Sequence, residues 1–303
     1  MPITPSTTSG FSALLAPDLW EVILETGNEV PLIYPVFMNE PDMPWRTVKS
    51  QQVAGLGTVP TKAEGQAFVT DAPNLENQKT ATPVAYGLAV VFSWEAWEDE
   101  LYGVFRDMAA ELARSSRYRL EVDAHTPINQ AFNTAYVGFN AGESLCYNTH
   151  TSPTTNTQQA NRPSPDVGFS VTGLQAALQS FYNLLNDRDL PQNAHPSTVL
   201  VNPVNLWAAR EILGSSGKPF TADNEMNSLI PEGLNWVIDR FITTTSNWFV
   251  VAPKGQHGLN FGVRTPPIFD AWDDPWTKNA VFSVFQRHIS WFTDWRGVYG
   301  STG

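Results

Sequence analysis

Hydrophobic residues recur every three or four positions from Trp94 onward, which predicts a long amphipathic helix. Ser93 precedes the pattern as an N-cap, acidic residues crowd the first turn, and arginines gather near the end, as the helix dipole favours. We expect a helix over 94–118, about 25 residues and about 37 Å long. Four residues of its apolar stripe are expected to support the fold itself: Trp94, Trp97, Leu101 and Phe105.

The rest of the chain mixes strand-like and helix-like patterns. Residues 84–92, VAYGLAVVF, predict a buried strand directly before the long helix. Further helices are expected at 127–135, 171–185 and 203–214. Strands are expected at 198–201, 236–241, 248–252 and, as a strand or hairpin, 280–300. The polar segment 146–168 predicts a surface loop.

Residues 1–45 are apolar but interrupted by prolines, so no long helix or central strand is expected there. Leu19, Val22 and Ile23 favour one or two helical turns, and the remainder predicts an extended arm. The arm carries large apolar side chains that must lie on some surface: Trp20, Ile33, Tyr34, Phe37 and Trp45.

Residues 46–82 predict a long hairpin that turns at 60–65, PTKAEG. Each leg is expected to contain about 12–14 residues, roughly 40–45 Å in extended form. Neither leg offers a strongly hydrophobic face, and an isolated two-stranded ribbon is marginal in water. The hairpin therefore needs a neighbouring surface, either on its own domain or on another molecule.

Composition narrows the classes of function. The chain has 303 residues, with 18 Lys and Arg against 30 Asp and Glu, and a formal net charge of −12. This balance disfavours binding to nucleic acid phosphates or to an anionic membrane surface. There is no apolar run long enough to cross a bilayer, and the N-terminal residues do not have the pattern of a signal peptide. We expect a soluble, intracellular protein with one large domain or two modest ones.

The usual catalytic and metal-binding patterns are missing from the sequence. None of the five histidines has the spacing of a ligand pair, and a single loop histidine is typically polar surface. The segment 142–146, GESLC, lacks the final glycine of a nucleophile elbow, and 55–57, GLG, is too short to bind phosphate. Cys146 has no disulfide partner and is expected to be a passive thiol. We therefore assign no catalytic, cofactor-binding or metal-binding residue.

Two other groups of residues invite a chemical interpretation. The acidic residues Glu95, Glu98, Asp99 and Glu100 are explained by the start of the helix, and Asp270, Asp273 and Asp274 by a turn-like stretch. The 11 tryptophans suggest carbohydrate stacking. However, Trp94, Trp97, Trp207 and Trp236 fall at positions expected in a core.

Four segments taken in order carry a resemblance to a known family. They are 64–105 with its Tyr-Gly, Ser-x-Glu and Glu-Asp-Glu pattern, 195–215 with a strand-then-helix step, 247–267, and the ending 292–301, FTDWRGVYGS. Together they resemble the major capsid (head) protein family of tailed double-stranded-DNA bacteriophages.

The resemblance implies an α+β fold, the tailed-phage major capsid fold. Its parts would be an N-terminal arm over 1–45 and an extended β-hairpin loop over 46–82. A peripheral domain with a long spine helix would cover 83–139 and 271–303, and an axial domain 140–270. Some relatives carry a scaffolding segment before the arm; here it would have been removed or replaced by a separate scaffold.

The resemblance further implies a structural protein, not an enzyme, that assembles as hexamers and pentamers into an icosahedral head. The head would enclose double-stranded DNA without sequence-specific binding. Portal and scaffolding proteins, and decoration proteins where present, would be its other partners. The protein would reside in the virion after assembly in the host bacterial cytoplasm. We expect assembly contacts at Trp20, Phe37, Trp45, Lys62, Glu64 and Phe68.

Two alternatives stay open from the sequence. The same fold serves encapsulin-like nanocompartments, which hold an enzyme cargo in place of a genome. A different class, an acidic and Trp-rich carbohydrate-active protein, would use Glu98 or Asp99. The loop region also holds Lys49, Lys62 and Lys79, but no motif identifies a crosslinking pair.

Overall fold

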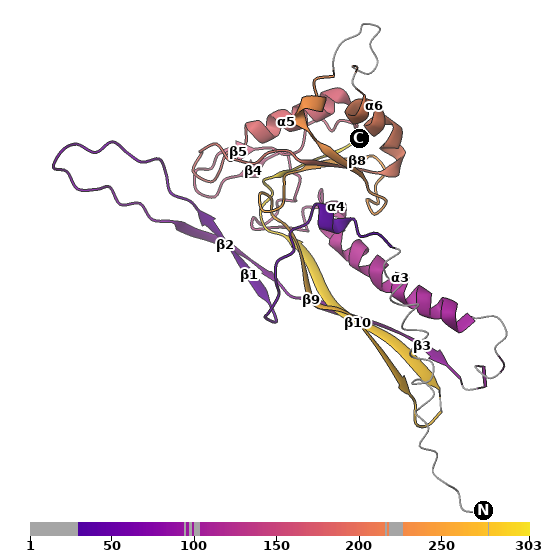
Figure 1. Ribbon diagram of the computed structural model, residues 1–303. Helices are drawn as coiled ribbons and strands as arrows, with labels where there is room; N and C mark the ends of the chain where they lie inside the picture. Colours follow the sequence, from indigo (N-terminus) through magenta and orange to yellow (C-terminus); the bar gives the residue numbers. More distant parts are fainter. Residues whose placement is uncertain are drawn as a thin grey trace, which may run out of the picture.

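The computed structural model describes residues 30–93, 95, 96, 99, 104–215, 217, 227–277 and 279–303. The predicted positions of Trp20, Trp94, Trp97 and Leu101 lie outside these ranges, as does the side chain of Phe105. The molecule is elongated: an upper body, a long sheet with a helix along it, and a ribbon that projects sideways (Figure 1). In the described ranges, no helix combines the length and the apolar character that crossing a membrane requires.

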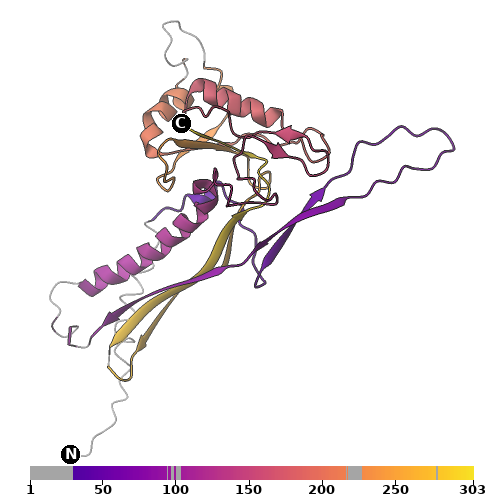
Figure 2. The ribbon, with the colours of Figure 1, turned by 180° about the vertical axis from the view of Figure 1, so that it is seen from behind.

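The long sheet has three antiparallel strands in the order β3-β10-β9. They are β3 (Val84–Phe92), β9 (Leu259–Asp273) and β10 (Ala280–Phe292). Alternate residues of β10, such as Phe282 and Val284, point to one face and form a core with Leu112 of helix α3 (Val104–Ala124). Figure 2 shows α3 lying along the sheet. The strand periodicity of two and the helix periodicity of three to four residues each create an apolar face, and these two faces pack together in one interface.

Two predictions about this region need correction. The helix continues to Ala124, six residues past the predicted end, because Leu120 and Ala124 extend its buried face. Its start lies outside the described residues, although Ser93 Oγ accepts the amide of Ala96 at 3.2 Å, as an N-cap does. Strand β3 is not buried: most of its side chains are exposed, because it forms an edge of the sheet.

The upper body contains a four-stranded sheet in the order β11-β8-β6-β7. Its strands are β6 (Thr198–Val201), β7 (Asn235–Ile238), β8 (Asn247–Val251) and β11 (Val298–Thr302), and only β6 and β7 are parallel. Successive residues of β6 point to opposite faces, so Val199 packs under helices α5 (Val171–Tyr182) and α6 (Leu206–Gly214), while Leu200 faces the centre of the molecule.

Several element boundaries in this region differ from the predictions. Helix α4 (Thr126–Asn129) is much shorter than the predicted 127–135. Residues 203–205 form a 3-10 turn, η2 (Pro203–Asn205), before α6 begins. A further 3-10 turn, η3 (Ile230–Glu232), precedes β7. The predicted loop 146–168 contains two short strands, β4 (His150–Thr151) and β5 (Gln158–Gln159), and buries His150, Ser152 and Asn161.

The described part of the arm, residues 30–45, packs against its own chain. Its 3-10 turn η1 (Tyr34–Val36) delivers Phe37 and Met38 into the central core between the end of α3, α4 and the start of β9. Met43 packs on Trp291 of β10, beside the base of the ribbon. The arm thus joins the long sheet to the upper body.

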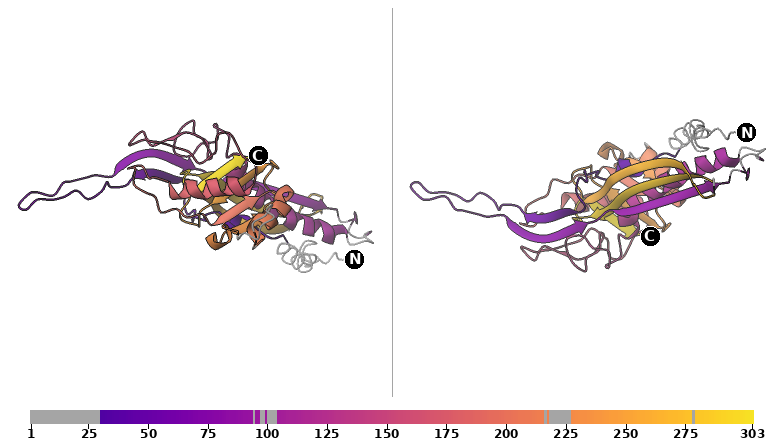
Figure 3. Two further views of the ribbon diagram at one scale, coloured as in Figure 1. Left: turned by 90° about the horizontal axis from the view of Figure 1, so that it is seen from above. Right: turned by 90° about the horizontal axis from the view of Figure 1, so that it is seen from below.

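The ribbon consists of β1 (Val48–Ala54) and β2 (Asn74–Ala81), paired antiparallel. Strand pairing stops at Ala54 and Asn74, so the legs are shorter than the predicted 12–14 residues. Beyond them, residues 55–73 form no ladder but still run far from the body (Figure 3). A long hairpin was expected, and the structure has a short ribbon with an irregular, outstretched end.

Candidate functional site: the extended loop and its anchor

The outstretched segment 55–73, hereafter the extended loop, exposes apolar side chains. Val59 is 96% exposed and Phe68 83%. Lys62 lies over the Phe68 ring, with Nζ 5.0 Å from the ring centroid. The tip turns at Gly65, whose φ of +76° is left-handed, within the predicted turn. Among the described residues, nothing packs on the distal part of this loop, so its apolar surface is available to another molecule.

The ribbon that bears the loop is fixed to the body by polar contacts. Lys79 Nζ donates to the carbonyl of Val137 at 2.6 Å, and burial lowers the pKa of Lys79. Asn77 donates to Asn140 Oδ1 at 3.2 Å, and the Thr154 hydroxyl donates to the Glu76 carboxylate. These contacts hold β2 against the connections that follow α4 and β4.

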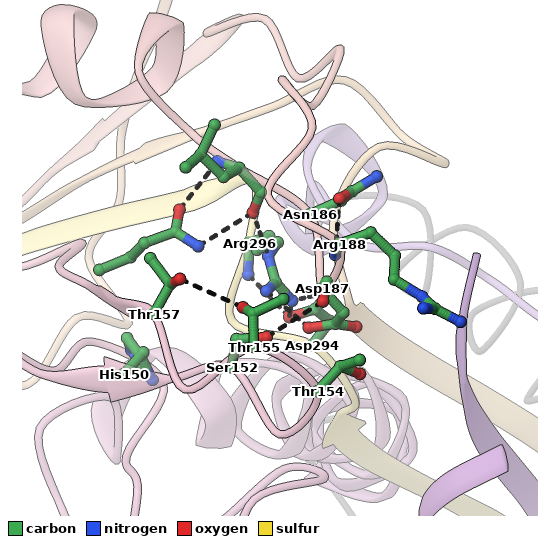
Figure 4. Close-up of polar contacts among 12 residues, drawn as sticks. His150, Ser152, Thr154, Thr155, Thr157, Asn186, Asp187, Arg188, Asp294 and Arg296 are labelled. Atoms are coloured by element: carbon green, nitrogen blue, oxygen red, sulfur yellow. Dashed lines mark hydrogen bonds and ion pairs between the residues drawn. The ribbon is translucent and has the colours of Figure 1, made fainter. Parts of the chain in front are cut away.

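The ribbon also contacts a buried charged cluster in the upper body. Gln52 of β1 donates to Asp187 Oδ2 at 3.3 Å, and the other oxygen of Asp187 accepts from Arg296 at 2.8 Å. Arg296 is almost fully buried and also lies 3.2 Å from Asp294. Figure 4 shows Asp187, Asp294 and Arg296 converging beside the loop that carries Ser152 and Thr155. Burial disfavours the Arg296 charge, but the two carboxylates outweigh it and raise its pKa.

The predicted assembly residues fall into three groups. Lys62, Glu64 and Phe68 all lie exposed on the extended loop, and Trp45 is 72% exposed. Phe37 is 1% exposed and packs inside its own chain, so it is not available to a neighbour. Trp20 lies outside the described residues.

The structure also corrects the expectation that the histidines are polar surface. Four of them are buried: His125, His150, His257 and His288. His150 stacks on Trp295, with 4.1 Å between ring centroids, and lies 2.9 Å from Glu143. The burial of these histidines was not predicted, because their partners lie far away in the sequence or in segments without a regular hydrophobic pattern.

A buried cluster of three ionisable residues joins the arm to the body. His125 Nε2 lies 2.7 Å from Asp239 Oδ2, and Glu121 Oε1 accepts the amide of Ile33 at 2.5 Å. Burial works against the imidazolium, but the contact with Asp239 prevails and raises the pKa of His125. Burial also raises the pKa of Glu121. The cluster is a structural clamp, since no described surface opens onto it.

A second buried pair locks α3 to the long sheet. Asp123 lies 2.7 Å from His288 Nε2, and Arg119 donates two hydrogen bonds to the same carboxylate. Burial tends to raise the pKa of Asp123, but these bonds outweigh it and lower that pKa. Arg119 was expected to mark the end of the helix; instead it pairs with a residue one turn further on.

Other candidate chemistry has a structural explanation. Asp274 accepts the amide of Trp276 and the hydroxyl of Thr277, and so caps the turn between β9 and β10. In the described ranges, no three His, Cys, Asp or Glu side chains are grouped to hold a metal ion. Cys146 is fully buried, and burial raises the pKa of its thiol. Trp207 is 67% exposed, not part of a core as expected.

Comparison with known proteins supports the resemblance to phage capsid proteins that the sequence carries. Residues 76–301 match the family described as phage capsid protein. No curated protein matches the chain. Among solved structures, the capsid of the cyanophage P-SCSP1u is similar at a TM-score of 0.60 and 12% identity, over 89% of this chain and 87% of that one. A virus-like particle from Pyrococcus furiosus is similar at 0.56 and 10% identity, over 93% and 97%.

The fold is therefore that of tailed-phage major capsid proteins, and the class that it defines is a capsid shell protein. The chain belongs to the phage capsid protein family, whose match covers about three quarters of it. Such a protein forms the shell of the virion from copies of itself. Membership in this family favours a shell protein over the carbohydrate-active alternative.

Proposed function

We propose that this chain assembles as hexamers and pentamers into the icosahedral head of a tailed phage, which encloses double-stranded DNA without reading its sequence. The single observation that carries the proposal is the extended loop. It reaches away from its own body and exposes Val59 and Phe68. Burying such surface between copies would stabilise a shell by about 25 cal/mol per Å² of apolar area.

Three assignments accompany the proposal. The contacts with neighbours lie at Trp45, Lys62, Glu64 and Phe68, and Trp20 belongs with them. Portal and scaffolding proteins, and decoration proteins where present, are the other partners, and assembly takes place in the host cytoplasm. The net charge of −12 supports a wall that does not bind the packed DNA tightly.

The proposed division into parts follows the same scheme. The arm covers 1–45, the extended loop region 46–82, the peripheral part 83–139 with β9 and β10, and the axial part the segment from 140 onward. Strand β11, expected in the peripheral part with the rest of 271–303, belongs instead to the axial part, because it pairs with β8. Strand β9 runs without a break through residues 270 and 271. We therefore place the boundary between axial and peripheral parts at Leu259, where β9 begins, in place of residue 271.

One alternative keeps some support. The similarity to a virus-like particle from Pyrococcus furiosus favours a nanocompartment that holds an enzyme cargo. The neighbouring genes discriminate: portal and terminase genes favour a phage head, while a single cargo enzyme favours a compartment.

The test is the size and shape of the purified full-length protein. We expect closed shells in the megadalton range by light scattering, with six-fold and five-fold capsomers by cryo-electron microscopy. A monomer or small oligomer near multiples of 33.5 kDa would overturn the proposal.

A variant without the loop sharpens this test. The amide of Gly57 already bonds the Asp71 carboxylate at 3.0 Å, so two glycines in place of 58–70 connect the legs without strain on the body. We expect this variant to fold with an unchanged unfolding midpoint and to form no shells. Shells of normal yield from it would show that the loop is not the contact.

A further inference from the structure

One arginine of the upper body ties both legs of the extended loop. Arg188 Nε donates to the carbonyl of Gly55 at 3.1 Å, and its Nη2 donates to the carbonyl of Ala72 at 3.3 Å. Gly55 follows the last residue of β1, and Ala72 lies two residues before β2. The guanidinium therefore bridges the loop at its root, where strand pairing stops.

The carboxylate of Asp71 completes this bridge. It lies 3.6 Å from Arg188 Nη2 and accepts the amides of Gly57 and Ala72 at 3.0 and 2.9 Å. These bonds, that from Gly57 first, lower the pKa of Asp71, so it is charged at neutral pH. The two legs are thus held by one cation and one anion together.

The turn that carries Arg188 is held firmly. Asn186 Oδ1 accepts the amides of Arg188 and Leu190 at 2.8 and 3.0 Å, which fixes the backbone on both sides of Asp189. The neighbouring Asp187 is bound to the buried Arg296. Figure 4 shows the Arg188 side chain pointing away from that pair. The arginine therefore projects from a turn anchored to the body and meets the loop just beyond the ribbon, where, among the described residues, no other side chain of the body bonds residues 55–73.

We propose that Arg188 is a positioning residue that sets the direction in which the extended loop leaves the body, and that uniform shell assembly depends on it. The inference rests on the proposed function, because it gives the loop its role between copies. A loop that projects this far turns a small change of angle at the root into a large displacement of Phe68. Lysine cannot replace arginine here, since a single ammonium lacks the fork that reaches two carbonyls.

The first arm of the test measures the loop in the unassembled protein by hydrogen–deuterium exchange. In Arg188→Ala we expect the amides of Gly57 and Ala72, which bond the Asp71 carboxylate beside Arg188, to exchange about five- to tenfold faster, as the loss of charge-assisted hydrogen bonds predicts. Arg188→Lys should lie between this variant and the original. Amides of α3 and β8, and the urea midpoint, should not change. Unchanged exchange in 55–73 would overturn the proposal.

The second arm measures assembly. Arg188→Ala should give at least about tenfold fewer shells or a broad mixture of diameters. Arg240 is an exposed arginine of the upper body, and Arg240→Ala should behave like the original protein. Shells of normal yield and a single diameter from Arg188→Ala would refute the positioning role. If the original protein forms no shells at all, the proposed function fails, and exchange at 55–73 still decides whether Arg188 holds the loop.

Discussion

His125 and Asp239 lie 2.7 Å apart with both side chains fully buried, one at the end of α3 and the other after β7. The His125 ring also packs between Phe37 of the arm and Phe241, each 5.2 Å away between centroids. One imidazole therefore joins three segments that are distant in sequence. A charge in such a place must be paired, because the interior solvates it poorly.

Removing Asp239 should test this pairing. Asp239→Ala leaves the buried imidazolium without its partner, and we expect a loss of about 3–5 kcal/mol in the free energy of unfolding. Asp239→Asn keeps an acceptor for the amide of Phe241, which Asp239 Oδ1 accepts at 2.8 Å, but it also removes the charge that pairs with the imidazolium, so most of this loss should remain. Urea unfolding followed by tryptophan fluorescence measures both. A loss of less than about 1 kcal/mol in Asp239→Asn would contradict the charged pair.

The burial of His257 predicts that the stability of the protein depends on pH. It is buried, its Nδ1 accepts the amide of Leu259 at 3.2 Å, and burial lowers its pKa to about 4 from an ordinary 6.5. A lowered folded-state pKa contributes stability that is complete above pH 6.5 and is lost as the pH falls toward 4. The loss amounts to about 2–3 kcal/mol.

The control is His257→Asn, whose Oδ1 can accept the same amide but does not titrate. We expect the difference in unfolding free energy between the original and this variant to change between pH 7 and pH 4. A constant difference over that interval would exclude a buried neutral histidine.

Phe37 and Trp45 form a matched pair of aromatic residues on the arm. Phe37→Ala opens a cavity in the core and should cost about 3–5 kcal/mol of stability. Trp45→Ala should change stability by less than about 0.5 kcal/mol, because the side chain is exposed, but should reduce shell yield. Thermal unfolding and sedimentation measure the two effects. A stable Phe37→Ala, or full assembly by Trp45→Ala, would contradict the placement of the respective residue.

Gly258 predicts a steric requirement where β9 begins. A Cβ there would collide with the backbone of Asp294, and Thr293 donates its amide to the Gly258 carbonyl at 3.0 Å. Gly258→Ala should therefore cost about 1–3 kcal/mol, as overpacking does. Gly214→Ala meets nothing within 4 Å and serves as the control. Similar unfolding midpoints for both variants would show that the approach of these segments is loose.

Local sequence patterns correctly predicted the helices and strands whose secondary structure depends mainly on their own residues. Strand β6 and helices α5 and α6 were expected from a run of β-branched residues and from apolar spacing, and they occur with small shifts at their ends. Strand β3 was predicted as a strand but not as an edge strand. Its run VAYGLAVVF is as apolar as that of a central strand, and only the sheet order shows that one side is unpaired with other described strands.

The candidate site could be predicted in part, again where local sequence patterns determine the structure. The turn at 60–65 and the exposed Lys62 and Phe68 follow from a segment without a hydrophobic face. Its anchor does not: Arg188 is 116 residues from Ala72, and Asp187 is 109 residues from Arg296. Such pairs leave no spacing in the sequence, and they exist only because the chain returns to the same place.

The extended loop has only three charged side chains among its residues 55–73, namely Lys62, Glu64 and Asp71. A contact that this segment makes with another molecule, here called a joint, is therefore held mainly by the burial of apolar surface. Ionic strength has little effect on such an interaction, because salt screens charges. Concentrated salt would leave such joints intact or tighten them, whereas cooling would weaken them, since the hydrophobic contribution falls with temperature. A particle built this way would withstand high salt concentration better than low temperature.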